Sequence, residues 1–82
     1  MKVGETIQLK AAHKAESRTK NRIRENGPLF LVQATPQTTR FDRAGRLWVM
    51  LESLAMNASD GQGGKEHWKG WLPIDEIEKE IT

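Results

Sequence analysis

Hydrophobic and polar residues alternate at the start of the chain. Over residues 3–10, Val3, Ile7 and Leu9 share one parity, and most polar residues take the other. Successive side chains of a β-strand point to opposite faces of the sheet. This period of two therefore predicts a first strand with one buried face.

Longer apolar runs occur further along the chain. Residues 29–35 and 46–54 are apolar on both parities, which indicates strands that are covered on both sides. Residues 67–72 carry two tryptophans and predict a fourth strand that ends at Pro73. Residues 55–66 are rich in Gly, Asn and Ser, so they predict the tip of a long hairpin.

Residues 11–28 are polar and basic. Their Ala, Lys, Arg and Glu residues favour helix intrinsically. Ile23 is the only large apolar residue, however, so a helix would have almost nothing to bury. We therefore predict a long, partly ordered basic loop that an Asn-Gly-Pro turn closes. The alternative is a helix over residues 10–25 docked on the sheet, which would make the domain α+β.

Size and composition restrict the architecture. The chain has 82 residues and no cysteine, so we expect a single domain over residues 1–82 without disulfides. Packing must then supply the stability, and a closed barrel leaves no strand edge exposed. The sequence shows neither a membrane-spanning apolar run nor a signal-peptide pattern. We expect no membrane partner and a cytoplasmic location.

The C-terminal motif Gly-Trp-Leu-Pro-Ile-Asp-Glu-Ile, residues 70–77, resembles the end of an SH3 domain. In that family a strand ending in glycine, two bulky apolar residues and proline leads into one tight helical turn. A β-branched residue, here Ile77, then begins the last strand. The order of elements also resembles that of KOW and Tudor modules. Short phage and bacterial proteins carry a similar Val-Gly-Glu opening.

This resemblance implies an all-β domain, namely an SH3-like five-stranded barrel with a long basic loop after the first strand and a short C-terminal helical turn. Peptide-binding SH3 domains grip polyproline with tyrosines from the first strand and the helical turn. This chain has no tyrosine, and Glu76 stands where the turn tyrosine would fall. The sequence therefore argues against polyproline recognition.

The tryptophans predict a protein contact. Trp68 and Trp71 are three residues apart, so they point to opposite faces of a strand. If Leu72 points into the core, Trp68 and Gly70 do so too, and Trp71 lies outside. An exposed tryptophan is a common anchor for a partner. The candidate partner-binding residues are Trp48, His67, Lys69 and Trp71.

Charge is unevenly distributed along the chain. Residues 1–46 carry ten Lys and Arg against four Asp and Glu, whereas residues 47–82 carry three against seven. Basic clusters bind phosphate backbones through counterion release, and an aromatic ring can stack a base. The alternative is a solvated loop whose arginines pair with the acidic C-terminal segment. The candidate nucleic-acid-binding residues are Lys14, Arg18, Lys20, Arg22, Arg24, Arg40, Phe41, Arg43 and Arg46, with Trp48 as a second stacking ring.

No motif predicts catalysis. The glycine-rich residues 61–65 lack both the earlier glycine and the following Ser or Thr of a Walker phosphate loop. His13 and His67 are the only histidines, too few for a convincing zinc site. We therefore expect a non-enzymatic binding module without cofactor or metal. Protein association, including self-association or a role as a small accessory subunit, is the favoured function. Nucleic-acid binding through residues 10–24 and 40–46 is the alternative. The partner's identity and the oligomeric state are left open.

Overall fold

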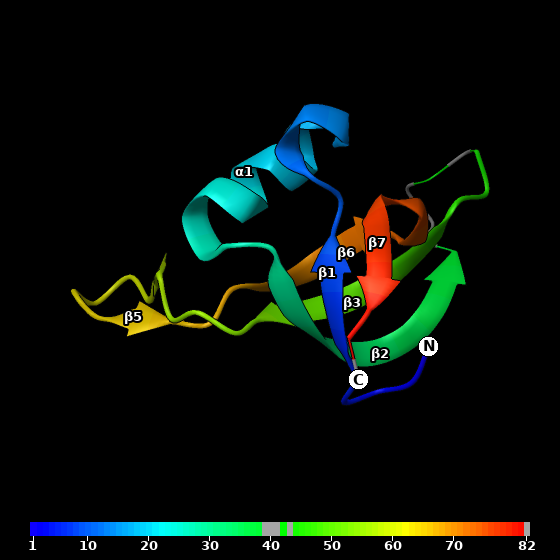
Figure 1. The fold of residues 1–82 in the computed structure, drawn as a ribbon. Coiled ribbons are helices and arrows are strands. Elements are labelled where there is room, and N and C mark those ends of the chain that lie inside the picture. The colour runs from blue at the N-terminus through cyan, green and yellow to red at the C-terminus, as the bar shows by residue number, and fades with distance from the viewer. Residues whose placement is uncertain (39–41, 43, 82) are drawn as a thin grey trace.

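A computed structural model describes residues 1–38, 42 and 44–81 of the chain. Five strands form one antiparallel sheet in the order β6-β3-β2-β1-β7, and two short strands pair as a separate hairpin, β4-β5 (Figure 1). The elements, in chain order, are β1 (Thr6–Leu9), η1 (Ala12–Lys14), α1 (Ser17–Asn26), β2 (Leu29–Thr38), β3 (Leu47–Ser53), β4 (Ala58–Ser59), β5 (Lys65–Glu66), β6 (Lys69–Pro73), η2 (Ile74–Glu76) and β7 (Ile77–Glu80).

The core lies on the inner face of the five-stranded sheet. Alternate residues of β1, β2 and β3 are buried, as the period of two in a strand requires. Each strand therefore contributes every second side chain to one apolar cluster. The fully or almost fully buried members of this cluster are Ile7, Leu9, Phe30, Val32, Val49, Leu51 and Leu72.

The sheet brings its first and last strands together. Strand β1 pairs with β2 on one side and with β7 on the other. The edge strands β6 and β7 do not pair with each other within the described residues, so the sheet is not closed. The domain is mostly β, but closure into the five-stranded barrel expected from the sequence is not confirmed.

The prediction of a basic loop after the first strand was wrong, because these residues form η1 and α1. Figure 1 shows α1 lying across one end of the sheet. Ile23 packs against the core, and Thr19 and Asn26 are buried. The helix ends at Gly27, whose φ of 78° suits glycine and whose N–H donates to the Ile23 carbonyl at 2.7 Å. The domain is therefore not purely β.

The C-terminal helical turn is present as η2, between β6 and β7. Its last residue, Glu76, is buried. One carboxylate oxygen accepts the backbone N–H of Glu16 at 2.8 Å, and the other lies 3.5 Å from Nζ of Lys10. Glu76 thus joins η2 to the start of α1.

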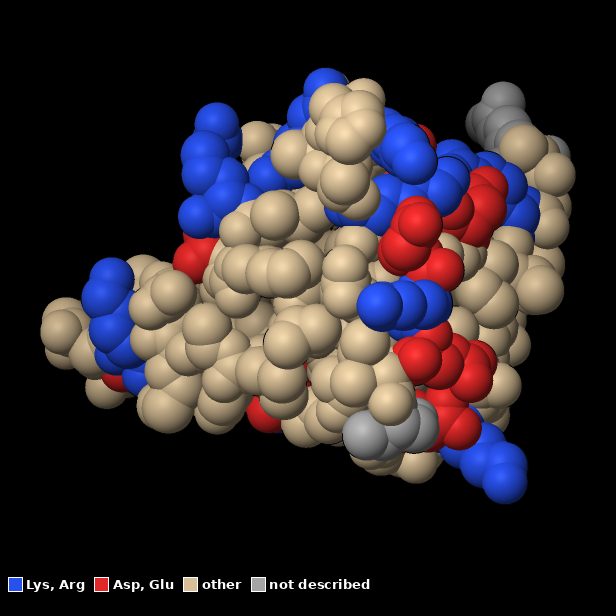
Figure 2. All heavy atoms as spheres, viewed as in Figure 1, with Lys and Arg blue, Asp and Glu red and all other residues tan. Residues whose placement is uncertain are grey.

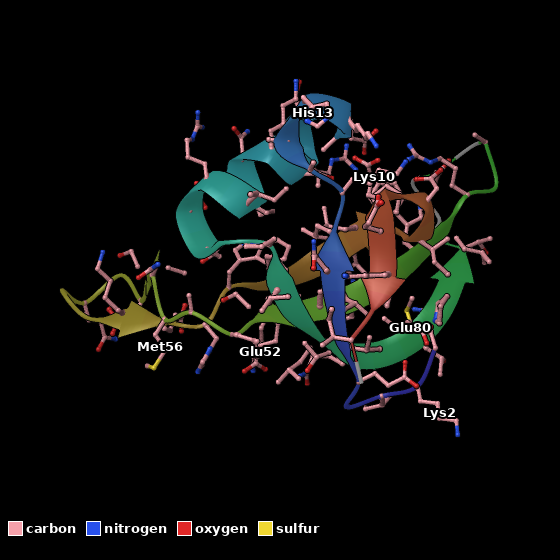
Figure 3. All side chains as sticks on the ribbon, in the orientation of Figure 1. Lys2, Lys10, His13, Glu52, Met56 and Glu80 are labelled. Carbon is pink, nitrogen blue, oxygen red and sulfur yellow. The ribbon has the colours of Figure 1, made fainter. Side chains whose placement is uncertain are left out.

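The end of the sheet opposite α1 is occupied by the N-terminal residues. The Met1 side chain packs against the core, and its ammonium group lies 3.7 Å from the Glu80 carboxylate. Figure 3 shows Lys2 and Glu80 at this end and His13 at the end that carries α1. Two chain segments, α1 and the N-terminal residues, therefore cover opposite ends of the same core.

Candidate functional site

Trp71 lies on the outer face of the sheet. Leu72 of β6 is fully buried, and Trp68, the residue before β6, packs against the core. Because neighbouring side chains of a strand alternate, Trp71 points the other way. It is half-buried there. Trp68 packs against the core as the parity argument expected, but the expectation that Trp71 is exposed was wrong, because Trp71 has the same intermediate burial as Trp68.

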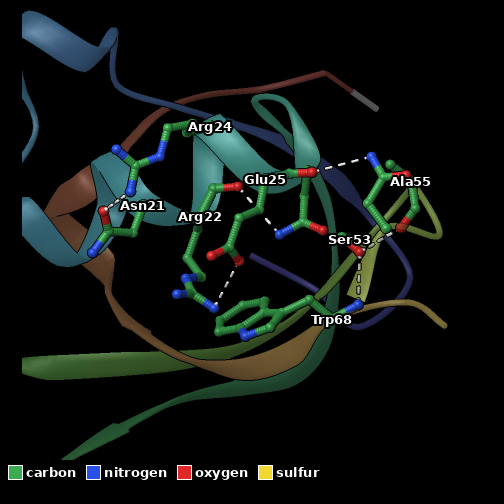
Figure 4. Close-up of polar contacts among 9 residues, drawn as sticks. Asn21, Arg22, Arg24, Glu25, Ser53, Ala55 and Trp68 are labelled. Carbon is green, nitrogen blue, oxygen red and sulfur yellow. Dashed lines mark hydrogen bonds and ion pairs between the residues drawn. The ribbon is translucent and has the colours of Figure 1, made fainter. Parts of the chain in front are cut away.

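Trp68 is held on the inner face by several contacts. Its ring meets Phe30 edge to face, with the ring centroids 5.9 Å apart. The Arg22 guanidinium of α1 lies 5.1 Å from the Trp68 ring centroid and 3.3 Å from the Glu25 carboxylate (Figure 4). Cation–π contacts of this kind stabilise a protein by about 0.5–1 kcal/mol at exposed sites. Trp68 therefore serves as the docking platform for α1.

Trp48 is engaged as well. The Arg18 and Arg46 guanidinium groups lie 4.8 and 5.6 Å from its ring centroid. Its indole N–H donates to the Asp42 carboxylate, and this bond lowers the pKa of Asp42, helped by the Ala44 N–H and by Arg46 and opposed by desolvation. A nucleobase that stacks on Trp48 would therefore compete with these guanidinium groups for the ring.

Arg46 connects Trp48 to the acidic residues around η2. Its guanidinium group lies 2.9 Å from the Asp75 carboxylate and 3.6 Å from that of Glu16. Pairing with Asp75 raises the pKa of Arg46. Of the arginines proposed to bind nucleic acid, Arg46 is thus already neutralised by two carboxylates.

The indole of Trp71 differs from the other two. Among the described residues, no hydrogen bond, ion pair or ring contact engages it. Its cross-strand neighbour in β3 is Met50, which in turn lies opposite Ala34 of β2. All three side chains are half-buried on the outer face. They form a short apolar row across three strands, which we call the Trp71 row.

Two cross-strand pairs of β3 and β6, one charged and one uncharged, flank the Trp71 row. On one side Lys69 of β6 lies opposite Glu52 of β3, with Nζ 3.7 Å from the carboxylate. On the other side stands the Trp48–Pro73 pair of the same two strands. Of the predicted partner-binding residues, Trp48, Lys69 and Trp71 therefore share this face. His67 precedes β6, and its Nδ1 donates to the Ser53 carbonyl at 2.7 Å.

The basic residues of the predicted loop divide between two faces of α1. Arg18 and Arg22 are directed at tryptophan rings. Lys14, Lys20 and Arg24 are exposed. Arg40, Phe41 and Arg43 lie outside the described residues, so the predicted extension of the basic patch through them is not tested.

Comparisons with protein-family models, curated proteins and solved structures found no match.

The described part of the chain contains no group of three or more His, Asp and Glu side chains that could hold a metal ion. Nor is any helix among these residues long and apolar enough to cross a membrane. Sequence reasoning missed Met50 and Ala34 as neighbours of Trp71. Their signal is the strand register, which a single sequence does not specify.

Proposed function

We propose that this chain is a non-enzymatic protein-binding module whose contact surface is centred on the Trp71 row. The observation that carries the proposal is the difference between the three tryptophans. The rings of Trp48 and Trp68 contact arginines and other partners, whereas the indole of Trp71, packed beside Met50, makes no hydrogen bond, ion pair or ring contact with the described residues. Trp71 is thus the tryptophan left for another molecule.

The composition of this face supports the proposal. Protein interfaces combine an aromatic and Met-rich centre with a polar rim. Trp71 and Met50 supply the centre, and the Lys69–Glu52 pair supplies charge at the edge. Side chains on neighbouring strands hold one another in place, so little conformational entropy would be lost on binding.

The SH3-like assignment remains part of this proposal. The turn η2 before the last strand and the pairing of β1 with both β2 and β7 support it. Pairing of the first strand with the last is what closure of a small barrel needs. In this proposal the domain does not bind polyproline, because the Arg18 and Arg46 guanidinium groups contact the Trp48 ring.

Site-specific photocross-linking tests the proposed surface. A benzophenone amino acid replaces Lys69, beside Trp71, and as a control replaces Lys65 in the β4-β5 hairpin. We expect a discrete protein adduct in the source cells from position 69 and none from position 65. Trp71→Ala should remove the adduct, because loss of a central tryptophan costs about 2 kcal/mol or more, roughly 30-fold in affinity.

Circular dichroism must first establish that Trp71→Ala is folded. Equal adducts from both positions, or an adduct from position 69 that survives Trp71→Ala, would refute the proposed surface. Sedimentation of the purified chain identifies one specific partner: a dimer that Trp71→Ala dissociates would be a second copy of the chain.

A further inference from the structure

The cations of residues 10–24 fall into two groups with different roles. Three of them are committed to partners within the domain. Lys10 pairs with the buried Glu76, Arg18 stacks on Trp48, and Arg22 contacts both Trp68 and Glu25. These side chains hold η2, α1 and the sheet together, so they are not free to bind another molecule without loss of those contacts.

The other three cations are exposed and uncompensated. Among residues the structure describes, Lys14 and Lys20 have no ion pair or hydrogen bond from the side chain. Arg24 donates to the neutral side-chain amide oxygen of Asn21 at 2.7 Å and therefore keeps its full charge. The domain thus presents three unpaired positive charges from one short segment.

Helix geometry places most of these groups together. Thr19, Ile23 and Asn26 face the core. With 3.6 residues per turn, Ser17, Asn21 and Arg24 lie on the side of α1 away from the core, Lys20 lies on its flank, and Lys14 precedes them in η1. We call these five residues the basic stripe.

The carboxylates near the basic stripe are engaged elsewhere. Glu25 also lies on the exposed side of α1, where it pairs with Arg22 at 3.3 Å. Glu16 lies 3.6 Å from Arg46, on the side of the helix that faces the sheet. Figure 2 shows Lys and Arg gathered over α1 and the turn before it, while Asp and Glu gather over β7.

We propose that the basic stripe docks the phosphodiester backbone of a nucleic acid. Lysine and arginine supply the charge, and the Ser17 hydroxyl and Asn21 amide are typical hydrogen-bonding partners of phosphate oxygens. An anionic membrane fits less well, because an interfacial helix also needs an apolar face to insert. No residue of the stripe is apolar. This surface is separate from the Trp71 row and does not rest on the protein-binding proposal.

The expected affinity depends steeply on salt and little on sequence. Each neutralised phosphate contributes a slope of about 0.9 in log affinity against log salt for duplex DNA. Three cations therefore predict a slope near −2.7, equivalent to a roughly 40-fold loss of affinity between about 50 and 200 mM salt. Single strands should give the shallower slope of about −2.1.

Fluorescence anisotropy with labelled duplex and single-stranded oligonucleotides tests the proposal. The variant Lys14→Gln/Lys20→Gln/Arg24→Gln removes the charge of the stripe. The matched control, Lys2→Gln/Lys65→Gln/Lys79→Gln, removes the same charge from exposed positions elsewhere. We expect the first variant to lose most of the salt dependence and at least about tenfold in affinity. The control should stay within about threefold of wild type.

Absence of salt-sensitive binding by the wild-type chain would overturn the proposal. Equal losses in the two triple variants would do the same, because they would show that net charge, not position, determines binding. Tighter binding to phosphatidylserine vesicles than to either oligonucleotide would assign the stripe to a membrane surface instead. Trp71→Ala should leave oligonucleotide binding unchanged, which separates this result from failure of the protein-binding proposal.

Discussion

Gly70 of β6 lies directly beneath the indole of Trp68. Its φ is outside the left-handed region, so an L side chain meets no backbone strain there. A Cβ at this position would lie 2.5 Å from Cζ2 and 2.7 Å from Cη2 of Trp68. Gly70→Ala therefore forces the ring away from its place between Phe30 and Arg22.

Two opposing terms determine the magnitude. Overpacking in a well-packed core costs about 1–3 kcal/mol. Replacing a strand glycine by alanine returns about 0.5–1 kcal/mol through the unfolded state. We expect Gly70→Ala to lower the free energy of unfolding by about 1–2 kcal/mol, a fall in Tm of roughly 4–15 °C for a domain of this size.

The ring can be removed to isolate the steric term. In a Trp68→Leu background, Gly70→Ala should be neutral or should stabilise by up to about 1 kcal/mol, because only the backbone term remains. Urea unfolding followed by far-UV circular dichroism measures all four proteins of this cycle. The same loss in both backgrounds would refute the packing argument, as would an unchanged stability of Gly70→Ala in the wild-type background.

Two further predictions concern polar groups. Thr19 is fully buried and its hydroxyl has no hydrogen-bond partner among the described residues, so Thr19→Val should raise the free energy of unfolding by about 1 kcal/mol in the same urea assay; a loss of stability would show that the hydroxyl is satisfied. The Asp42 pKa is lowered below its ordinary value of 3.8, chiefly by the Trp48 hydrogen bond. Ionised Asp42 therefore contributes to the free energy of unfolding above that value, and this contribution is lost as pH falls through the folded-state pKa. Asp42→Asn should therefore destabilise the protein at neutral pH and have no effect once Asp42 is protonated. Thermal unfolding of both proteins across pH measures this, and a difference in Tm that persisted in strong acid would contradict it.

The sheet could be anticipated from the sequence because burial follows the strand period closely. Ile7 and Leu9 alternate with polar residues, and both are buried in β1. The turn η2 and the start of β7 at Ile77 lie within the C-terminal motif of residues 70–77, directly after Pro73. In both cases a local pattern and its tertiary environment agree, which is the condition under which sequence reasoning succeeds.

The helix could not be anticipated from apolar periodicity, because α1 buries little apolar surface. Only Ile23 fits an apolar pattern. The helix docks through Ile23, Thr19 and Asn26, and the Arg22 guanidinium lies over Trp68. Long cationic side chains cover apolar surface while keeping their charge hydrated. A pattern that counts arginine only as polar therefore underestimates how firmly such a helix attaches.

Only the part of the candidate site that depends on local relations could be predicted from the sequence. The face of the sheet on which Trp71 lies followed from its position next to Leu72 in the sequence, which is a local relation. Its neighbour Met50 depends on the register between β3 and β6, and the engagement of Trp48 depends on a loop and a helix that meet it from elsewhere in the chain. Long-range relations of this kind are not specified by spacing alone.

The residues of α1 carry a net charge of +3 and those of β7 a net charge of −1, so charge is unevenly distributed in a domain whose total charge is only +2. A charged surface nearby exerts a torque on such a molecule before contact is made. An anionic surface would turn α1 toward itself and β7, with Glu78 and Glu80, away from it. The molecule would then arrive already oriented, so a nearly neutral domain can approach a polyanion in one preferred pose.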